Sequence, residues 1–153
     1  MQFRRRKNSI RNGAVLDIPS YYYMITLVTK FRNPIFGFIK DGQLIQSLHG
    51  ETAKKYWEEI PKIYPCAELF EFIIMPDHIH GIILLKENAE KPKSIAHIIQ
   101  YYKREVTKEI HLNDPNSSVN IWQRSFWARG FKGESKLKAY EQYIRRNPLA
   151  FAK

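Results

Sequence analysis

Two strand-like runs separated by only two residues constrain the fold of this chain more than any other feature. Leu69 to Met75 and His78 to Leu85 are rich in apolar and β-branched residues, and Pro76 and Asp77 lie between them. Parallel strands need a crossover of a dozen or more residues, so these two runs must pair antiparallel. The second run is continuously apolar after its histidines, which predicts a central strand covered on both faces.

Further strands and helices alternate around this pair. Asp41-Gly42 between two apolar runs predicts a hairpin, because the turn needs residues that tolerate positive φ. Ser94 is expected to cap the second helix, and Asn147-Pro148 to end the last one. The other expected elements are strands at Ser20 to Phe31 and Ile121 to Phe131, and helices at Gly50 to Tyr64, Ile95 to Ile110 and Ser135 to Arg146. This order predicts an α+β fold of the ferredoxin-like, split βαβ type, with an antiparallel sheet and helices mainly on one face.

The charge of the chain indicates a polyanionic partner. Lysine and arginine number 25 against 15 acidic residues, so the formal net charge is +10. The 153 residues are expected to form one domain, 1–153, in which residues 1–18 are a basic N-terminal arm.

Cys66 is the single cysteine, which excludes a disulfide framework and a cysteine-based zinc cluster. No apolar run is long enough to cross a membrane, and no signal peptide is evident, so a cytoplasmic protein is expected.

Of all the tripeptides in the sequence, His78-Ile79-His80 is the strongest candidate for a reactive or metal-binding site. Side chains alternate across a strand, so the two imidazoles project from one face while Ile79 faces the other. Two imidazoles on a rigid strand make half of a site for a divalent metal. The alternative is that the pair marks the exposed end of a strand.

Tyr143 and Asn147 form a second candidate pair. They are four residues apart, so they lie on one helix face if the helical turn continues as far as Asn147. A tyrosine can act as a covalent nucleophile when a metal or a base assists removal of its proton. The alternative is an ordinary helix tyrosine, since the chain has nine tyrosines.

Aromatic and basic residues alternate between these two features, in Ile121 to Arg129. This pattern suits single-stranded nucleic acid, because bases stack on aromatic rings and guanidinium groups hold phosphates. Trp122 could equally be a core residue. The candidate DNA-binding residues are Arg4, Arg5, Arg6, Lys7, Arg32, Lys103, Arg104, Arg124, Trp127, Arg129, Arg145 and Arg146.

Four segments of the chain, in this order and spacing, resemble the single-tyrosine transposases of the IS200-like group, and most closely the REP-associated tyrosine transposases. They are Tyr22-Tyr23-Met24-Ile25-Thr26 with Arg32 nearby, Met75 to Gly81, Ile121 to Trp127, and Tyr143 to Pro148. The resemblance extends from near residue 20 to the C-terminus.

This resemblance implies a nuclease of the HUH type. In such enzymes two histidines and a polar residue on the tyrosine helix hold one Mg²⁺ or Mn²⁺, and here these would be His78, His80 and Asn147. Tyr143 matches the nucleophile, which attacks single-stranded DNA next to a hairpin and leaves a 5′-phosphotyrosine and a free 3′-OH. The family also implies a monomer or homodimer that works on nucleoid DNA in the cytoplasm.

Two other functions remain open from the residues alone. The first is a non-catalytic module that binds hairpins or single strands, which the same aromatic and arginine content would serve. The second is a metal-dependent RNA endonuclease on the same fold, which would need a 2′-OH. Metal uptake by His78 and His80 separates the binding module from the enzymes.

Overall fold

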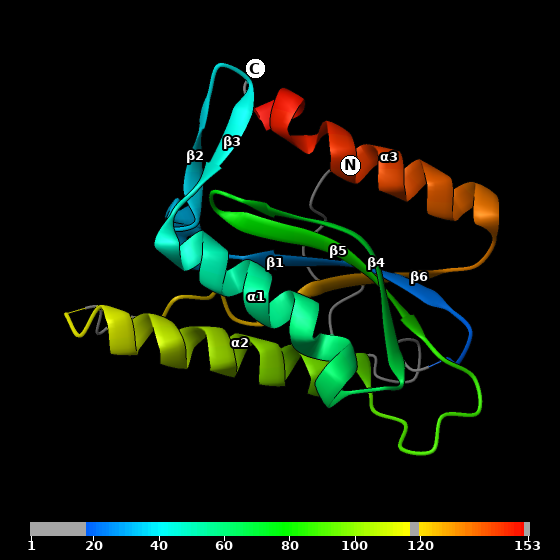
Figure 1. Ribbon diagram of the computed structural model, residues 1–153. Coiled ribbons are helices and arrows are strands. Elements are labelled where there is room, and N and C mark those ends of the chain that lie inside the picture. The colour runs from blue at the N-terminus through cyan, green and yellow to red at the C-terminus, as the bar shows by residue number, and fades with distance from the viewer. Residues whose placement is uncertain (1–17, 117–119, 152–153) are drawn as a thin grey trace.

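A four-stranded antiparallel sheet forms the centre of the computed structural model, which describes residues 18–116 and 120–151 (Figure 1). The strand order is β4-β5-β1-β6, and a separate hairpin pairs β2 with β3. The strands are β1 (Tyr22–Val28), β2 (Gly37–Lys40), β3 (Gln43–Gln46), β4 (Ala67–Met75), β5 (His78–Leu85) and β6 (Trp127–Phe131). The helices are α1 (Leu48–Ile63), α2 (Ile95–Asn113) and α3 (Glu134–Phe151), with a short 3-10 turn, η2 (Lys30–Arg32).

The connections confirm the predicted ferredoxin-like topology. β1 and β4 are joined through α1 and have β5 between them, while β5 and β6 are joined through α2 and have β1 between them. All neighbouring strands of the sheet are antiparallel. Helices α1 and α2 cover one face and α3 crosses the other (Figure 1), so the helices lie mainly on one face, as expected.

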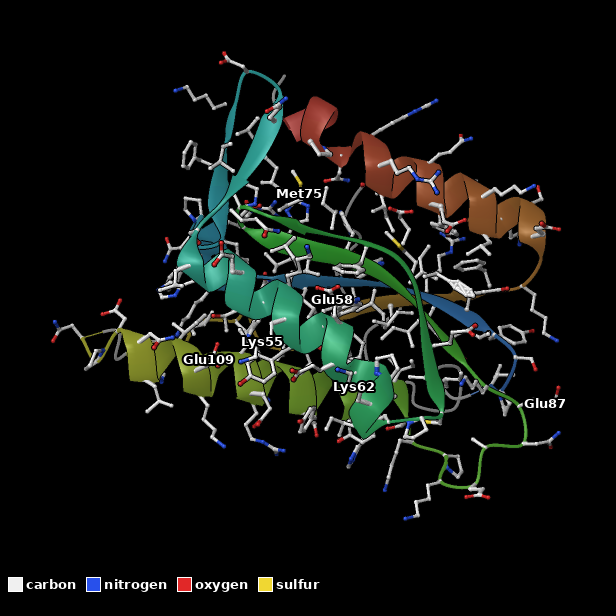
Figure 2. All side chains as sticks on the ribbon, in the orientation of Figure 1. Lys55, Glu58, Lys62, Met75, Glu87 and Glu109 are labelled. Carbon is white, nitrogen blue, oxygen red and sulfur yellow. The ribbon has the colours of Figure 1, made fainter. Side chains whose placement is uncertain are left out.

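The larger core lies between the sheet and helices α1 and α2. Trp57 of α1 packs edge-on against Tyr102 of α2, with ring centroids 5.2 Å apart, and both side chains are fully buried. A Cβ atom at Gly81 of β5 would lie 2.3 Å from Cζ2 of Trp57, so glycine lets α1 approach the central strand. At the surface, Lys55 of α1 and Glu109 of α2 link the two helices through a 2.9 Å ion pair (Figure 2).

A smaller core lies on the opposite face, between the sheet and α3. It consists of buried Met24, Ile82, Phe131 and Ile144, with partly buried aromatic residues packed around them. Tyr140 of α3 stacks near Phe131 of β6 with ring centroids 4.5 Å apart. This core fixes α3 over the sheet face from which the even-numbered residues of β5 project.

Local sequence signals explain where several elements begin and turn. Ser47 and Ser94 cap α1 and α2, because their hydroxyl oxygens accept hydrogen bonds from backbone N–H groups three residues later. Asp41 and Gly42 both have positive φ, as the predicted hairpin turn requires. The predicted strand from Ile121 to Phe131 is wrong in its first half. Only Trp127–Phe131 is a strand, because Ser125 adopts a φ of 71° and interrupts the extended backbone.

The predicted end of the last helix is also wrong. The helix was expected to stop at Arg146, yet α3 continues to Phe151 with Pro148 inside it. A proline removes one backbone hydrogen bond and crowds the preceding turn, which weakens a helix without forbidding it. Pro61 lies inside α1 in the same way. As a result Asn147 stays in helical geometry, one turn after Tyr143.

Candidate metal centre and nucleophile

His78 and His80 lie side by side at the start of β5, on the sheet face that α3 covers. The register pairs His78 with Val28 and His80 with Thr26 on β1. Both imidazoles are buried, at 4% and 3% exposure, and their ring centroids are 4.7 Å apart. On the other side of β5, His78 pairs with Met75, which Figure 2 shows at the end of β4 near the C-terminal half of α3. The pair is therefore a buried cluster rather than the exposed end of a strand.

Each histidine ring is held in place by a contact at its Nδ1 atom. Asp77 Oδ1 lies 2.7 Å from Nδ1 of His78, and Thr26 Oγ1 lies 2.9 Å from Nδ1 of His80. Asp77 is itself held by Arg32, whose Nε donates to Oδ2 over 3.0 Å. Contacts of this kind fix the orientation of an imidazole, so Nε2 is the nitrogen with which each ring would bind a metal.

Helix α3 brings Asn147 and Tyr143 to the same cluster. Asn147 Oδ1 lies 3.2 Å from Nε2 of His78, and Asn147 is buried, with 8% of the residue exposed. The Tyr143 ring is half-buried and lies edge-on to His80, with ring centroids 5.5 Å apart. Ile144, between these two residues in the chain, is buried in the smaller core and anchors this part of the helix. The structure thus brings together all four residues that the sequence singled out.

The electrostatics of the cluster keep His80 neutral. Burial, together with the charge of nearby His78, lowers the pKa of His80 from 6.5 to about 3. Burial alone would raise the pKa of Asp77. The hydrogen bond and charge of His78, together with the Arg32 guanidinium, outweigh burial and lower the pKa of this carboxyl below its usual value. A neutral imidazole has the lone pair that metal binding requires.

The donor set fits a divalent cation. Two imidazole nitrogens and an amide oxygen form a mixed nitrogen and oxygen set that metals of this class accept. Within residues 18–116 and 120–151, no three His, Cys, Asp or Glu side chains gather into a metal site. Asn147 Oδ1, 3.2 Å from Nε2 of His78, is the oxygen that α3 brings to the two histidines.

Two of the candidate DNA-binding residues lie on the same sheet face as the histidines. Trp127 of β6 pairs with Thr26, and Arg129 pairs with Met24, so both side chains project toward the α3 side. Arg124, Arg145 and Arg146 are exposed, and Arg145 forms a 3.1 Å ion pair with Glu71.

The other candidates lie elsewhere or have partners within the protein. Lys103 and Arg104 belong to α2, which covers the opposite face of the sheet (Figure 1). The Lys103 ammonium donates to the carbonyl oxygens of Gln123 and Ser125, at 3.1 and 2.6 Å. Trp122 is a core residue, 4% exposed, whose indole N–H donates to the Lys103 carbonyl. Arg4, Arg5, Arg6 and Lys7 of the N-terminal arm lie outside the described residues.

A family model described as "Transposase IS200 like" matches residues 17–147. The chain belongs to this family. Family and fold together support a transposase, which is a DNA-processing enzyme. No helix in the described ranges is long and apolar enough to cross a membrane.

Two relatives come from Haemophilus influenzae strain Rd. An uncharacterised protein is 27% identical over 146 residues, which cover 84% of this chain and 80% of the relative. A second protein, provisionally named a REP-associated tyrosine transposase, is 26% identical over 134 residues, covering 84% of this chain and 69% of the relative.

Two solved structures share the fold. One is a REP-associated tyrosine transposase bound to a REP hairpin, with a TM-score of 0.66, 18% identity, and coverage of 99% of this chain and 74% of that one. The other is a protein from Deinococcus radiodurans R1 that is provisionally named a transposase, with a TM-score of 0.55, 17% identity, and coverage of 82% of this chain and 88% of that one.

Asp77 and Thr26 are the site residues that the sequence did not reveal. Asp77 directly precedes His78, so its position was a usable signal. Thr26 becomes a partner of His80 only through the pairing of β1 with β5, which no local pattern indicates.

Proposed function

We propose that the chain is a metal-dependent transesterase that cleaves and rejoins single-stranded DNA next to a hairpin through a 5′-phosphotyrosine. The convergence of two elements on one cluster carries this proposal. β5 supplies His78 and His80, and α3 supplies Asn147 and Tyr143 over them. A tyrosine placed against a divalent metal site, on a strongly basic chain, suits attack on a phosphodiester.

Nε2 of His78, Nε2 of His80 and Oδ1 of Asn147 are the atoms that would hold Mg²⁺ or Mn²⁺. The first and third of these atoms lie 3.2 Å apart, so α3 brings an oxygen ligand directly to the histidines. When bound, such an ion polarises the scissile phosphate and neutralises its charge. Asp77 and Thr26 keep both imidazoles oriented for this task.

Tyr143 is the proposed nucleophile. Its phenolic oxygen forms a bond to phosphorus while the bond from phosphorus to the 3′-oxygen breaks. The phenol loses its proton, and the departing 3′-oxygen ends as a hydroxyl. The covalent link keeps the phosphodiester energy, so a free 3′-OH can later attack the phosphotyrosine and rejoin a strand without ATP. The contact with His80 and the anchored helix hold the ring for this attack.

Hairpin DNA is the proposed substrate, since the solved relative is bound to a REP hairpin. Trp127 and Arg129 on the histidine face and Arg146 on α3 would hold the strand, with the residues of the N-terminal arm on the hairpin phosphates. We propose that the protein does this as a monomer or homodimer on nucleoid DNA.

Formation of a covalent adduct tests this function. The protein is incubated with Mn²⁺ and labelled hairpin oligonucleotides with single-stranded flanks, and adducts are resolved on a denaturing gel. We expect an adduct from wild type and from Tyr140→Phe, a matched α3 tyrosine, and none from Tyr143→Phe. Binding of the oligonucleotides without any adduct would instead indicate the non-catalytic binding module.

A further inference from the structure

Phe31 in η2 holds an aromatic ring in solvent on a strained backbone. Its side chain is 81% exposed, the largest value for a bulky apolar residue in the described ranges. Its φ of 56° and ψ of 19° lie in the left-handed region, and Arg32 follows with a φ of 53°. A bulky residue rarely adopts this conformation, which persists only where the surrounding structure imposes it.

The contacts that impose this conformation come from the neighbourhood of the proposed metal site. The Thr29 N–H donates to the Asp77 carbonyl over 3.0 Å, and the Lys30 N–H donates to the Ile121 carbonyl over 2.8 Å. Arg32 Nε donates to the Asp77 carboxylate over 3.0 Å. The turn is thus fixed on both sides of Phe31.

Phe31 therefore lies next to the groups that orient a metal ligand. Arg32, the following residue, holds Asp77, and Asp77 holds Nδ1 of His78. On the other side, the Lys30 ammonium lies 5.5 Å from the centroid of the Phe31 ring. An exposed aromatic face with a cation beside it is the combination that binds a nucleobase and its phosphate.

We propose that Phe31 is a stacking platform for one base of the single-stranded DNA that leads to the scissile phosphate, with Lys30 at the adjoining phosphate. This inference rests on the proposed function, which supplies the single strand. The Lys30 ammonium at the ring and the overall +10 charge favour a nucleic acid over an apolar protein surface. Stacking accepts any base, so the platform would hold the strand without reading its sequence.

A fluorescence experiment on uncleaved DNA tests the platform. Hairpin oligonucleotides carry 2-aminopurine at one flanking position at a time, and binding is measured in EDTA so that no cleavage occurs. Wild type, Phe31→Leu and Phe31→Trp are compared with Ile63→Ala. Ile63 is a half-exposed apolar residue at the C-terminal end of α1, the end farther along the chain from the β2–β3 hairpin, and it serves as the matched control.

We expect wild type and Ile63→Ala to quench 2-aminopurine at one flanking position. Phe31→Leu should lose that quench and bind about 5- to 150-fold more weakly, while Phe31→Trp should retain both. Quenching and affinity in Phe31→Leu equal to those of wild type would overturn the platform alone, provided that wild type still forms the Tyr143 adduct with Mn²⁺. Absence of both DNA binding and the adduct in wild type would overturn the proposed function, and the platform with it.

Discussion

Replacing Thr26 with valine removes the contact that orients His80 and leaves the shape of the side chain almost unchanged. Thr26 Oγ1 lies 2.9 Å from Nδ1 of His80, and both side chains are 3% exposed, so no bulk water can replace the lost hydroxyl. Valine is β-branched like threonine and suits a strand, so β1 should keep its pairing with β5.

The expected effect is a loss of metal affinity. Removing the outer partner of a metal-bound histidine typically weakens binding about 10- to 100-fold, which corresponds to about 1.4–2.7 kcal/mol. The unfolding free energy of the metal-free protein should also fall by about 1–3 kcal/mol, because a buried ring nitrogen loses a hydrogen-bonding partner.

Titration of the protein with Mn²⁺, followed by calorimetry or by the EPR signal of free Mn²⁺, measures the first quantity. Thr26→Ser is the matched control, because it restores the hydroxyl and should bind Mn²⁺ within a few-fold of wild type. If Thr26→Val binds Mn²⁺ as tightly as wild type while remaining folded, the argument that Thr26 orients a metal ligand is wrong.

Three further outcomes follow from the structure. Gly81→Ala should lower the unfolding free energy in urea by about 1–3 kcal/mol, because the new Cβ meets Trp57, and a change below about 0.5 kcal/mol would contradict this. In EDTA, the unfolding free energy should fall as pH drops from 6.5 toward 3, by about 2 kcal/mol at pH 5, because the unfolded state binds a proton on His80 that the folded state excludes. The slope of unfolding free energy against pH should flatten in His80→Gln, and an equal slope in both proteins would refute this role of His80. Arg129→Gln should reduce the log–log slope of DNA affinity against salt by about 0.7–0.9, and an unchanged slope would remove Arg129 from the DNA-binding surface.

Much of the fold could be predicted because local patterns determine it. The two-residue turn between β4 and β5 dictates an antiparallel pair, and Asp41-Gly42 dictates the second hairpin. Alternation along β5 placed both histidines on one face, and the four-residue spacing of Tyr143 and Asn147 placed those two on one helix face.

The remaining features depend on contacts between distant parts of the chain. Thr26 meets His80 only because β1 lies beside β5 in one particular register. Helix α3 continues past Pro148, although a proline removes one backbone hydrogen bond, so the local sequence alone does not predict where the helix ends. The Lys103 ammonium donates to two carbonyls of a loop that precedes β6, a contact that only the packed structure reveals.

Mapping of the covalent adduct by mass spectrometry tests the central claim most directly. Wild-type protein is incubated with Mn²⁺ and a flanked hairpin oligonucleotide, the DNA is trimmed with nuclease, and the peptides are sequenced. The account predicts a nucleotide joined through its 5′-phosphate to Tyr143, and a new 3′-OH on the released strand. A nucleotide on any other residue, or cleaved DNA with no modified peptide, would contradict it.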